Sequence, residues 1–215
     1  MFNKQQIARI KAVCFCAALL PLARLVWLGI ADDLGANPIE FVIRSNGTWA
    51  LTMLLITLTM TPIRILTGAT WQMQLRRMLG LFAFFYACLH VTCYVWLDQW
   101  FDWKAVGHDI VKHPFIIAGF SAFMMLIPLA VTSNQASMRK LRQRWQKLHK
   151  LVYPIAILAC LHYWWLVKKD IRQPAIYAVV LLILLGLRIY AKKSPASPRA
   201  RPQPVAQHQQ RQVEV

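Results

Sequence analysis

Acidic side chains are scarce in this sequence. Its 215 residues include eight Asp and Glu against 25 Lys and Arg, and only 15% of the residues are charged. A soluble domain usually has about 25% charged residues, so the composition argues against a soluble enzyme and against a disordered protein. The five cysteines are odd in number, lie in apolar runs and lack zinc-ligand spacing. We therefore expect buried, reduced thiols rather than a disulfide-stapled secreted domain.

Nucleotide-binding motifs are also missing. The sequence contains no G-x-G-x-x-G pattern and no P-loop, and no unit of 20–50 residues repeats along it. Residues 194–215 are rich in Pro, Gln and Arg, a composition that cannot bury a core, so we expect a disordered tail there. This tail is also too short to form a nucleotide-binding domain.

Apolar residues are abundant, at 58% of the chain with a mean hydropathy of +0.41. A membrane-spanning helix needs about 20 of them. Six such segments are bounded by charge or Pro: 10–30, 47–66, 78–97, 114–132, 148–167 and 174–191. We expect an all-α, polytopic bundle of six transmembrane helices over residues 1–193. The first segment follows Lys4 and Arg9 and could instead be a signal peptide, although its apolar run is longer than a typical h-region.

The distribution of charge predicts the topology. With the N-terminus in the cytoplasm, 18 Lys and Arg lie on inner segments and six on outer ones. Seven of the eight acids lie outside, and only Glu214 lies inside. The positive-inside rule then places both termini in the cytoplasm, and only the short loop 168–173 runs against it. The net charge of +17 is thereby explained by membrane orientation and does not require nucleic acid as a partner.

Three histidines lie in or at the edge of the expected third and fifth helices. His90 follows Arg77 by 13 residues and His162 follows Lys150 by 12, so both would sit about 18–20 Å above the inner charged boundary. Two neutral imidazoles at one depth can take the two axial positions of a haem iron. The simpler interpretation is that each His only bonds a neighbouring helix. Zinc would need further ligands, which are not evident.

His149 would lie about 20 Å lower than His162, near the inner surface. It could ligate a second haem with an unidentified partner, hold a flavin or a quinone, or face lipid headgroups. The nearby Arg64, Arg76 and Arg77 could bind haem propionates or a flavin phosphate. They could equally anchor the protein to anionic lipid, and the two roles are compatible.

Several short motifs resemble the MsrQ family, within the ferric-reductase-like transmembrane group. The matching stretches are Leu58–Arg64, Arg76–Leu81, Leu89–His90, Thr132–Gln135, Arg144–Tyr153 and His162–Tyr163. The resemblance extends over about residues 10–190. It implies a bacterial inner-membrane, haem b-binding subunit that passes electrons to a periplasmic MsrP-type molybdopterin subunit, which reduces methionine sulfoxide in oxidised proteins.

The resemblance also implies cofactors and roles. Family members associate with FMN and receive electrons from quinol or from a cytosolic flavin reductase. His90, His149 and His162 match the family's histidines, with His90 and His162 as the axial pair. The larger group has two histidines on each of helices three and five, whereas helix three here has one, so the number of haems stays open.

The missing nucleotide-binding motif means that electrons must come from a separate donor. We expect the outer loop 98–113, with Asp98, Asp102, Trp103 and Asp109, to form part of the docking surface for the periplasmic subunit. The alternatives are a ferric or quinone reductase subunit with another acceptor, and a haem-free protein. Such a haem-free protein would be an assembly subunit, or a transporter in which buried histidines relay protons.

Overall fold

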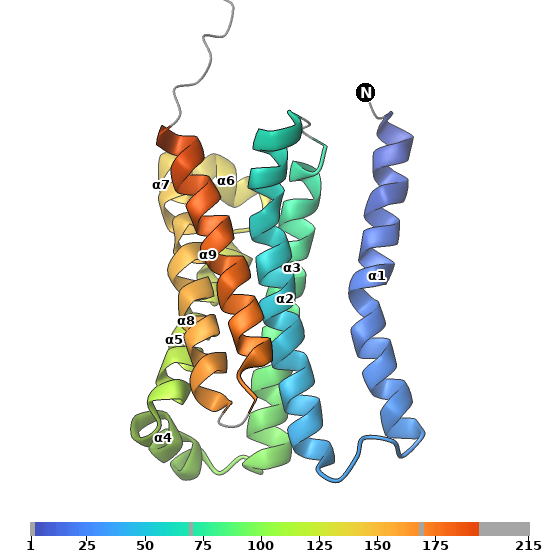
Figure 1. Cartoon of the computed structure of the whole chain (residues 1–215), viewed down its shortest axis with the longest axis vertical. Coiled ribbons are helices and arrows are strands. Elements are labelled where there is room, and N and C mark those ends of the chain that lie inside the picture. The colour runs from blue at the N-terminus through green and yellow to red at the C-terminus, as the bar shows by residue number, and fades with distance from the viewer. Residues whose placement is uncertain (1–2, 69–70, 168–169, 194–215) are drawn as a thin grey trace, which may run out of the picture.

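The computed structural model describes residues 3–68, 71–167 and 170–193, and these residues form helices and loops with no β-strand among them. The α-helices are α1 (Lys4–Ile30), α2 (Pro38–Thr67), α3 (Met73–Cys93), α4 (Trp103–Lys112), α5 (Pro114–Val131), α6 (Gln135–Leu141), α7 (Gln143–Leu148), α8 (Val152–Leu166) and α9 (Arg172–Lys193). A π-helical turn, η1 (Tyr94–Asp98), continues α3, and a 3₁₀ turn, η2 (His149–Leu151), precedes α8. The long helices run up and down one bundle (Figure 1). The all-α prediction is therefore confirmed for the described residues.

Among the described residues, five helical segments are long and apolar enough to cross a membrane: α1, α2, α3 together with η1, α5 and α9. Each overlaps one of the segments expected from the sequence. The main difference is at α2, which begins at Pro38 rather than near residue 47, since Asn37 caps it and proline suits a first helical turn. The chain is thus a multi-pass membrane protein.

The fifth expected segment, 148–167, is not one continuous α-helix. It consists of η2 followed by α8, which has 15 residues and so spans about 22 Å, against about 30 Å for the hydrocarbon core. Pro154 has no N–H to donate to the carbonyl of Lys150, so the regular helix begins only just before it. A sixth membrane crossing at this segment stays a prediction.

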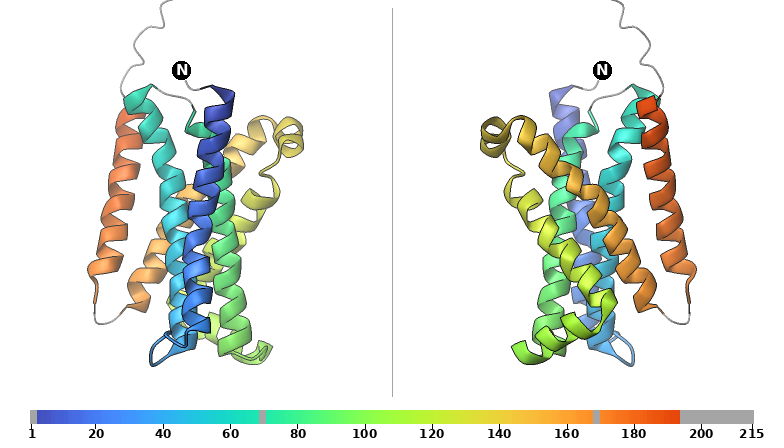
Figure 2. Two further views of the ribbon diagram at one scale, coloured as in Figure 1. Left: turned by 90° about the vertical axis from the view of Figure 1, so that its right-hand side faces the viewer. Right: turned by 90° about the vertical axis from the view of Figure 1, so that its left-hand side faces the viewer.

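The bundle core forms where two helix pairs pack together. α2 lies along α3, and α5 lies along α8, while α9 contacts α2 and α8. Figure 2 shows α5 and α8 side by side and tilted relative to α9. Leu54, Tyr86 and Ile155 are among the buried core side chains. α1 is peripheral, and the Tyr86 hydroxyl ties it to the bundle by donating to the carbonyl of Ala18 at 2.7 Å.

The two ends of the bundle differ. The start of α1, the end of α9 and the helices α6 and α7 lie at one end, and α4 lies at the other (Figure 1). The expected tail 194–215 lies outside the described residues. The segment 98–113, expected as a loop, contains α4. Asp102 caps this helix by accepting from the backbone N–H groups of Lys104 and Ala105, and the Tyr94 hydroxyl donates to the Asp109 carboxylate at 3.0 Å.

All five cysteines are free thiols, as expected. The expectation that all are buried is wrong, because Cys16 is exposed and the other four are partly buried. Cys16 lies on α1, a long helix that packs only lightly against α2 and α3, so part of its surface is left uncovered.

Candidate metal centre

His90 on α3 and His162 on α8 face each other inside the bundle. Their ring centres are 6.1 Å apart and their planes are inclined at 78°. The sequence predicted this pair from depth alone, and the structure brings the two residues together. They come from different helix pairs, so the packing of α2–α3 against α5–α8 sets the distance between them.

The hydrogen bonds of the two rings determine which ring nitrogen carries a hydrogen. Nδ1 of His90 bonds the carbonyl of Ile43 at 2.9 Å, and Nδ1 of His162 bonds the carbonyl of Phe115 at 2.7 Å. A carbonyl oxygen only accepts, so Nδ1 must be the donor and carry the hydrogen in both rings. In a neutral imidazole, Nε2 then keeps its lone pair, which is the form that binds a metal.

Two glycines make room for these rings. A Cβ on Gly47 would lie 2.9 Å from Nδ1 of His90, and a Cβ on Gly119 would lie 2.7 Å from Nδ1 of His162. Real Cβ atoms do not approach other atoms so closely, so only glycine lets α2 and α5 come near enough for the Nδ1 bonds. Gly47 and Gly119 are therefore part of the site, although the sequence analysis did not identify them.

The two halves of the site are related by a sequence offset. The offset is 72 residues, and it relates Ile43 to Phe115, Gly47 to Gly119 and His90 to His162. The segments 87–90 and 159–162 are both Ala-Cys-Leu-His. This offset is longer than the 20–50 residues of the common structural repeats. Pairing positions that lie 72 residues apart identifies the two glycines together with the two histidines.

Both imidazoles line a cavity of about 530 Å³ between α2, α3, α4, α5 and α8. This volume lies within the range of sites for small molecules and cofactors, about 300–1,000 Å³. The walls are mainly aliphatic and aromatic, for example Leu54, Phe123 and Ile155. Within residues 3–68, 71–167 and 170–193, Arg44 is the only Lys, Arg, Asp or Glu that lines the cavity. The cavity is thus suited to a large apolar ligand with little charge.

The spacing of the two rings suits a shared metal. An imidazole nitrogen binds a metal at about 2.0–2.1 Å and lies about 1.1 Å from its ring centre, so an ion held in line between two imidazoles separates the ring centres by about 6.3 Å. The observed 6.1 Å is close to this value. Within the described residues, no group of three or more His, Cys, Asp or Glu could hold a metal. The pair therefore offers two ligands to such an ion.

His149 belongs to a different region. It does not line this cavity, and its ring stacks on Trp145 with 3.9 Å between ring centres. Its Nδ1 bonds the Trp145 carbonyl at 3.1 Å, whereas its Nε2 is buried without a hydrogen-bond partner. The structure therefore does not join His149 to the His90–His162 pair.

The two arginines named from the sequence are neighbours near the start of α3, and Arg76 lies close enough to His149 to interact with it. Arg76 is half-buried and interacts electrostatically with Arg188 and His149, while Arg77 is exposed. The guanidinium of Arg188 lies over the ring of Tyr153 at 4.9 Å. Neither Arg76 nor Arg77 lines the cavity of the histidine pair.

Comparison with known proteins identifies the family. Residues 46–160 match the family described as ferric reductase like transmembrane component. Three relatives carry the name protein-methionine-sulfoxide reductase heme-binding subunit MsrQ. The protein from Herminiimonas arsenicoxydans is 51% identical over 188 residues, covering 86% of each chain. Those from Bordetella pertussis and Xanthomonas campestris pv. campestris strain 8004 are 52% and 48% identical, over 86% and 89% of this chain and 91% and 90% of their own.

The identity with these relatives extends over most of the chain, and the family match contains Gly47, His90 and Gly119 of the paired-histidine site and ends two residues before His162. The chain therefore belongs to the MsrQ family of ferric-reductase-like transmembrane proteins.

Proposed function

We propose that this chain is the haem b-binding subunit of a protein-methionine-sulfoxide reductase system and carries electrons across the membrane. The observation that carries the proposal is the pair His90–His162, with both Nδ1 atoms bonded to carbonyls and ring centres 6.1 Å apart in an apolar cavity. The names of the relatives, which describe them as heme-binding subunits, support it.

A porphyrin fits the donor set better than a bare ion does. Two histidines alone leave a zinc site incomplete, since zinc takes three or four protein ligands. A haem iron needs only two axial ligands from the protein, because the macrocycle supplies the other four. Two further features agree with this assignment. The cavity is wide and apolar, and each imidazole occupies space that a Cβ would take if Gly47 or Gly119 were any other residue.

Haem would supply one-electron redox chemistry at this position. His90 and His162 would hold the iron through Nε2 and leave no open position, which suits electron transfer better than oxygen binding. The carbonyls of Ile43 and Phe115 fix the ring orientations and increase the basicity of Nε2. Leu54, Phe123 and the other apolar wall residues would exclude water from the site.

The direction of electron flow follows from the topology that we propose, with both termini in the cytoplasm of a bacterial inner membrane. The helix α4 contributes the lining residues Trp103, Val106 and Ile110. It lies at the end of the bundle opposite the start of α1 and the end of α9 (Figure 1). The cavity would then lie toward the periplasm. Electrons would pass to a periplasmic MsrP-type molybdopterin subunit, and quinol or a cytosolic flavin reductase would donate them.

The region of His149 is the place for a second redox site. A buried, unpartnered Nε2 is costly unless a ligand satisfies it, which favours haem, flavin or quinone over the lipid-facing alternative. We propose a second haem at His149, with Arg76 and Arg77 available for propionates or for the phosphate of FMN. The FMN prediction itself comes from the family resemblance, and no residue is assigned to it.

Two other classes of function differ from this proposal in ways that can be measured. A ferric or quinone reductase subunit would share the haem and differ in its acceptor. A transporter or an assembly subunit would contain no haem, and the histidines would then relay protons or only join helices.

The reduced-minus-oxidised optical spectrum of the purified protein tests the proposal. We expect a low-spin b-type spectrum, and we expect the contribution of the His90–His162 haem to be lost in His90→Ala and in His162→Ala. The control is His108→Ala, because His108 is exposed on α4 and does not line the cavity. A folded wild-type protein without haem would overturn the proposal in favour of transport or assembly.

A further inference from the structure

One charged residue lies in the wall of the paired-histidine cavity. Arg44 on α2 follows Ile43, whose carbonyl holds His90, and it lies one helical turn before Gly47. Among the described residues it is the only Lys, Arg, Asp or Glu that lines the cavity. Arg44 also belongs to the small outer set of cations, so its place here is not explained by the excess of Lys and Arg on inner segments.

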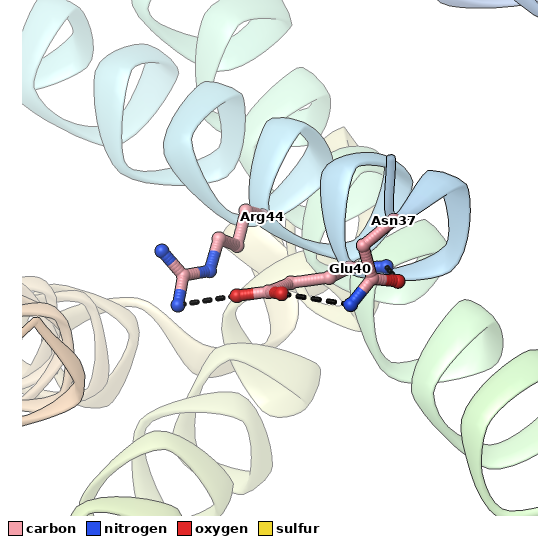
Figure 3. Close-up of polar contacts among 3 residues, drawn as sticks. All are labelled: Asn37, Glu40 and Arg44. Carbon is pink, nitrogen blue, oxygen red and sulfur yellow. Dashed lines mark hydrogen bonds and ion pairs between the residues drawn. The ribbon is translucent and has the colours of Figure 1, made fainter. Parts of the chain in front are cut away.

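The neighbours of Arg44 hold it loosely. Glu40 forms an ion pair with it one turn earlier on α2, and the amide of Asn37 donates to Glu40 at 2.9 Å. Figure 3 shows these three side chains in a row along the helix. The side chains of Arg44 and Glu40 are about half exposed, and such exposed pairs contribute little stability. A guanidinium has five N–H donors, so Arg44 can accept a second anionic partner.

Haem b carries two propionate carboxylates, which need cations or water at the edge of an apolar site. Arginine is the side chain best matched to a carboxylate, because it can donate two parallel hydrogen bonds.

We propose that Arg44 binds a propionate of the haem held between His90 and His162, and that Glu40 positions the guanidinium. This inference rests on the proposed function and deepens it. It also changes the assignment made from the sequence, since Arg76 and Arg77 do not line this cavity. A carboxylate bound by Arg76 or Arg77 would lie in the His149 region.

The first test is the midpoint potential of the haem in the purified full-length protein. A nearby positive charge favours the reduced iron, and a nearby negative charge favours the oxidised iron. We expect Arg44→Gln to lower the reduced-to-oxidised ratio at a fixed ambient potential by about tenfold, which is 59 mV for one electron. Glu40→Gln should shift this ratio in the opposite direction.

The matched control is Arg172→Gln. Arg172 is another exposed outer arginine, and it does not line the cavity, so the same loss of charge should leave the potential unchanged. A wild-type protein that contains haem, with an unchanged potential in Arg44→Gln, would overturn this inference and leave the proposed function standing. A folded wild-type protein without haem would overturn both.

The second test separates a propionate from a lipid phosphate, the other anion available at a membrane surface. Haem-depleted wild-type and Arg44→Gln proteins are reconstituted with haem b and with its dimethyl ester, in which both carboxylates are blocked. We expect wild type to retain haem b several-fold better than Arg44→Gln, and the two proteins to retain the ester equally. If the difference persists with the ester, Arg44 acts on lipid or on the fold, and the inference fails.

Discussion

Gly119 on α5 approaches His162 on α8 so closely that a Cβ at this glycine would lie 2.7 Å from Nδ1 of the ring. The same contact recurs at 2.9 Å between Gly47 and His90. In both cases the residue four positions before the glycine supplies the carbonyl that bonds Nδ1. The glycine and the carbonyl together place each imidazole in one position and in one tautomer.

Gly119→Ala should displace the ring of His162 and break its bond to Phe115. Losing such an outer-shell contact typically costs about 10–100-fold in metal affinity, so we expect haem retention to fall by that order, with Gly47→Ala behaving alike. The measurement is the haem-to-protein ratio after purification. Gly186→Ala is the control, because a Cβ there meets nothing within 4 Å. Equal haem contents in all three variants would show that the close approach does not matter.

His149→Ala tests the second site separately. His149 does not line the main cavity, so we expect the His90–His162 haem to keep its spectrum in this variant. Total haem per protein should fall from two equivalents to one, since the ligand of the second haem is removed. A ratio that stays constant would exclude a haem at His149, and a loss of both haems would show that the two regions are coupled.

Asp98→Lys tests the proposed docking surface. Asp102 and Asp109 are unsuitable for charge reversal, since the first caps α4 and the second accepts from Tyr94. Asp98 bonds only its neighbour Gln99. We expect reversal to slow haem reoxidation by the periplasmic subunit several-fold, and more so at low salt. Asp33→Lys, on the exposed α1–α2 loop, should have no effect. Equal rates in the two variants would place docking elsewhere.

Tyr86→Phe tests how α1 is held. The Tyr86 hydroxyl is buried and donates to the Ala18 carbonyl at 2.7 Å, and a lost hydrogen bond of this kind costs about 1 kcal/mol. We expect a lower unfolding temperature in detergent with an unchanged haem spectrum, because Tyr86 does not line the cavity. Tyr190→Phe, at an exposed position on α9, is the control. Should both variants unfold like the wild type, α1 would not depend on this bond.

The helices could be predicted from the sequence because a membrane requires long apolar segments with charges at their ends. The pairing of His90 with His162 could be predicted because a constant rise per residue converts sequence position into depth. His149, Arg76 and Arg77 were grouped by the same reasoning, and none of the three lines the cavity.

Other features depend on three-dimensional contacts that periodicity does not reveal. Gly47 and Gly119 matter only because α2 and α5 pack beside the histidine-bearing helices. The break before α8 depends on one missing N–H at Pro154. The role of Arg44 becomes visible only when the cavity wall is known, since by sequence it is one outer cation among six.

The most direct test of the central claim is the low-temperature electron paramagnetic resonance spectrum of the oxidised protein. Two histidine ligands with ring planes crossed at 78° should give a strongly anisotropic low-spin ferric signal. We expect this signal in the wild type, and we expect it to disappear in both His90→Ala and His162→Ala. A haem-loaded protein whose strongly anisotropic low-spin signal survives both substitutions would contradict the claim that these two residues share one iron.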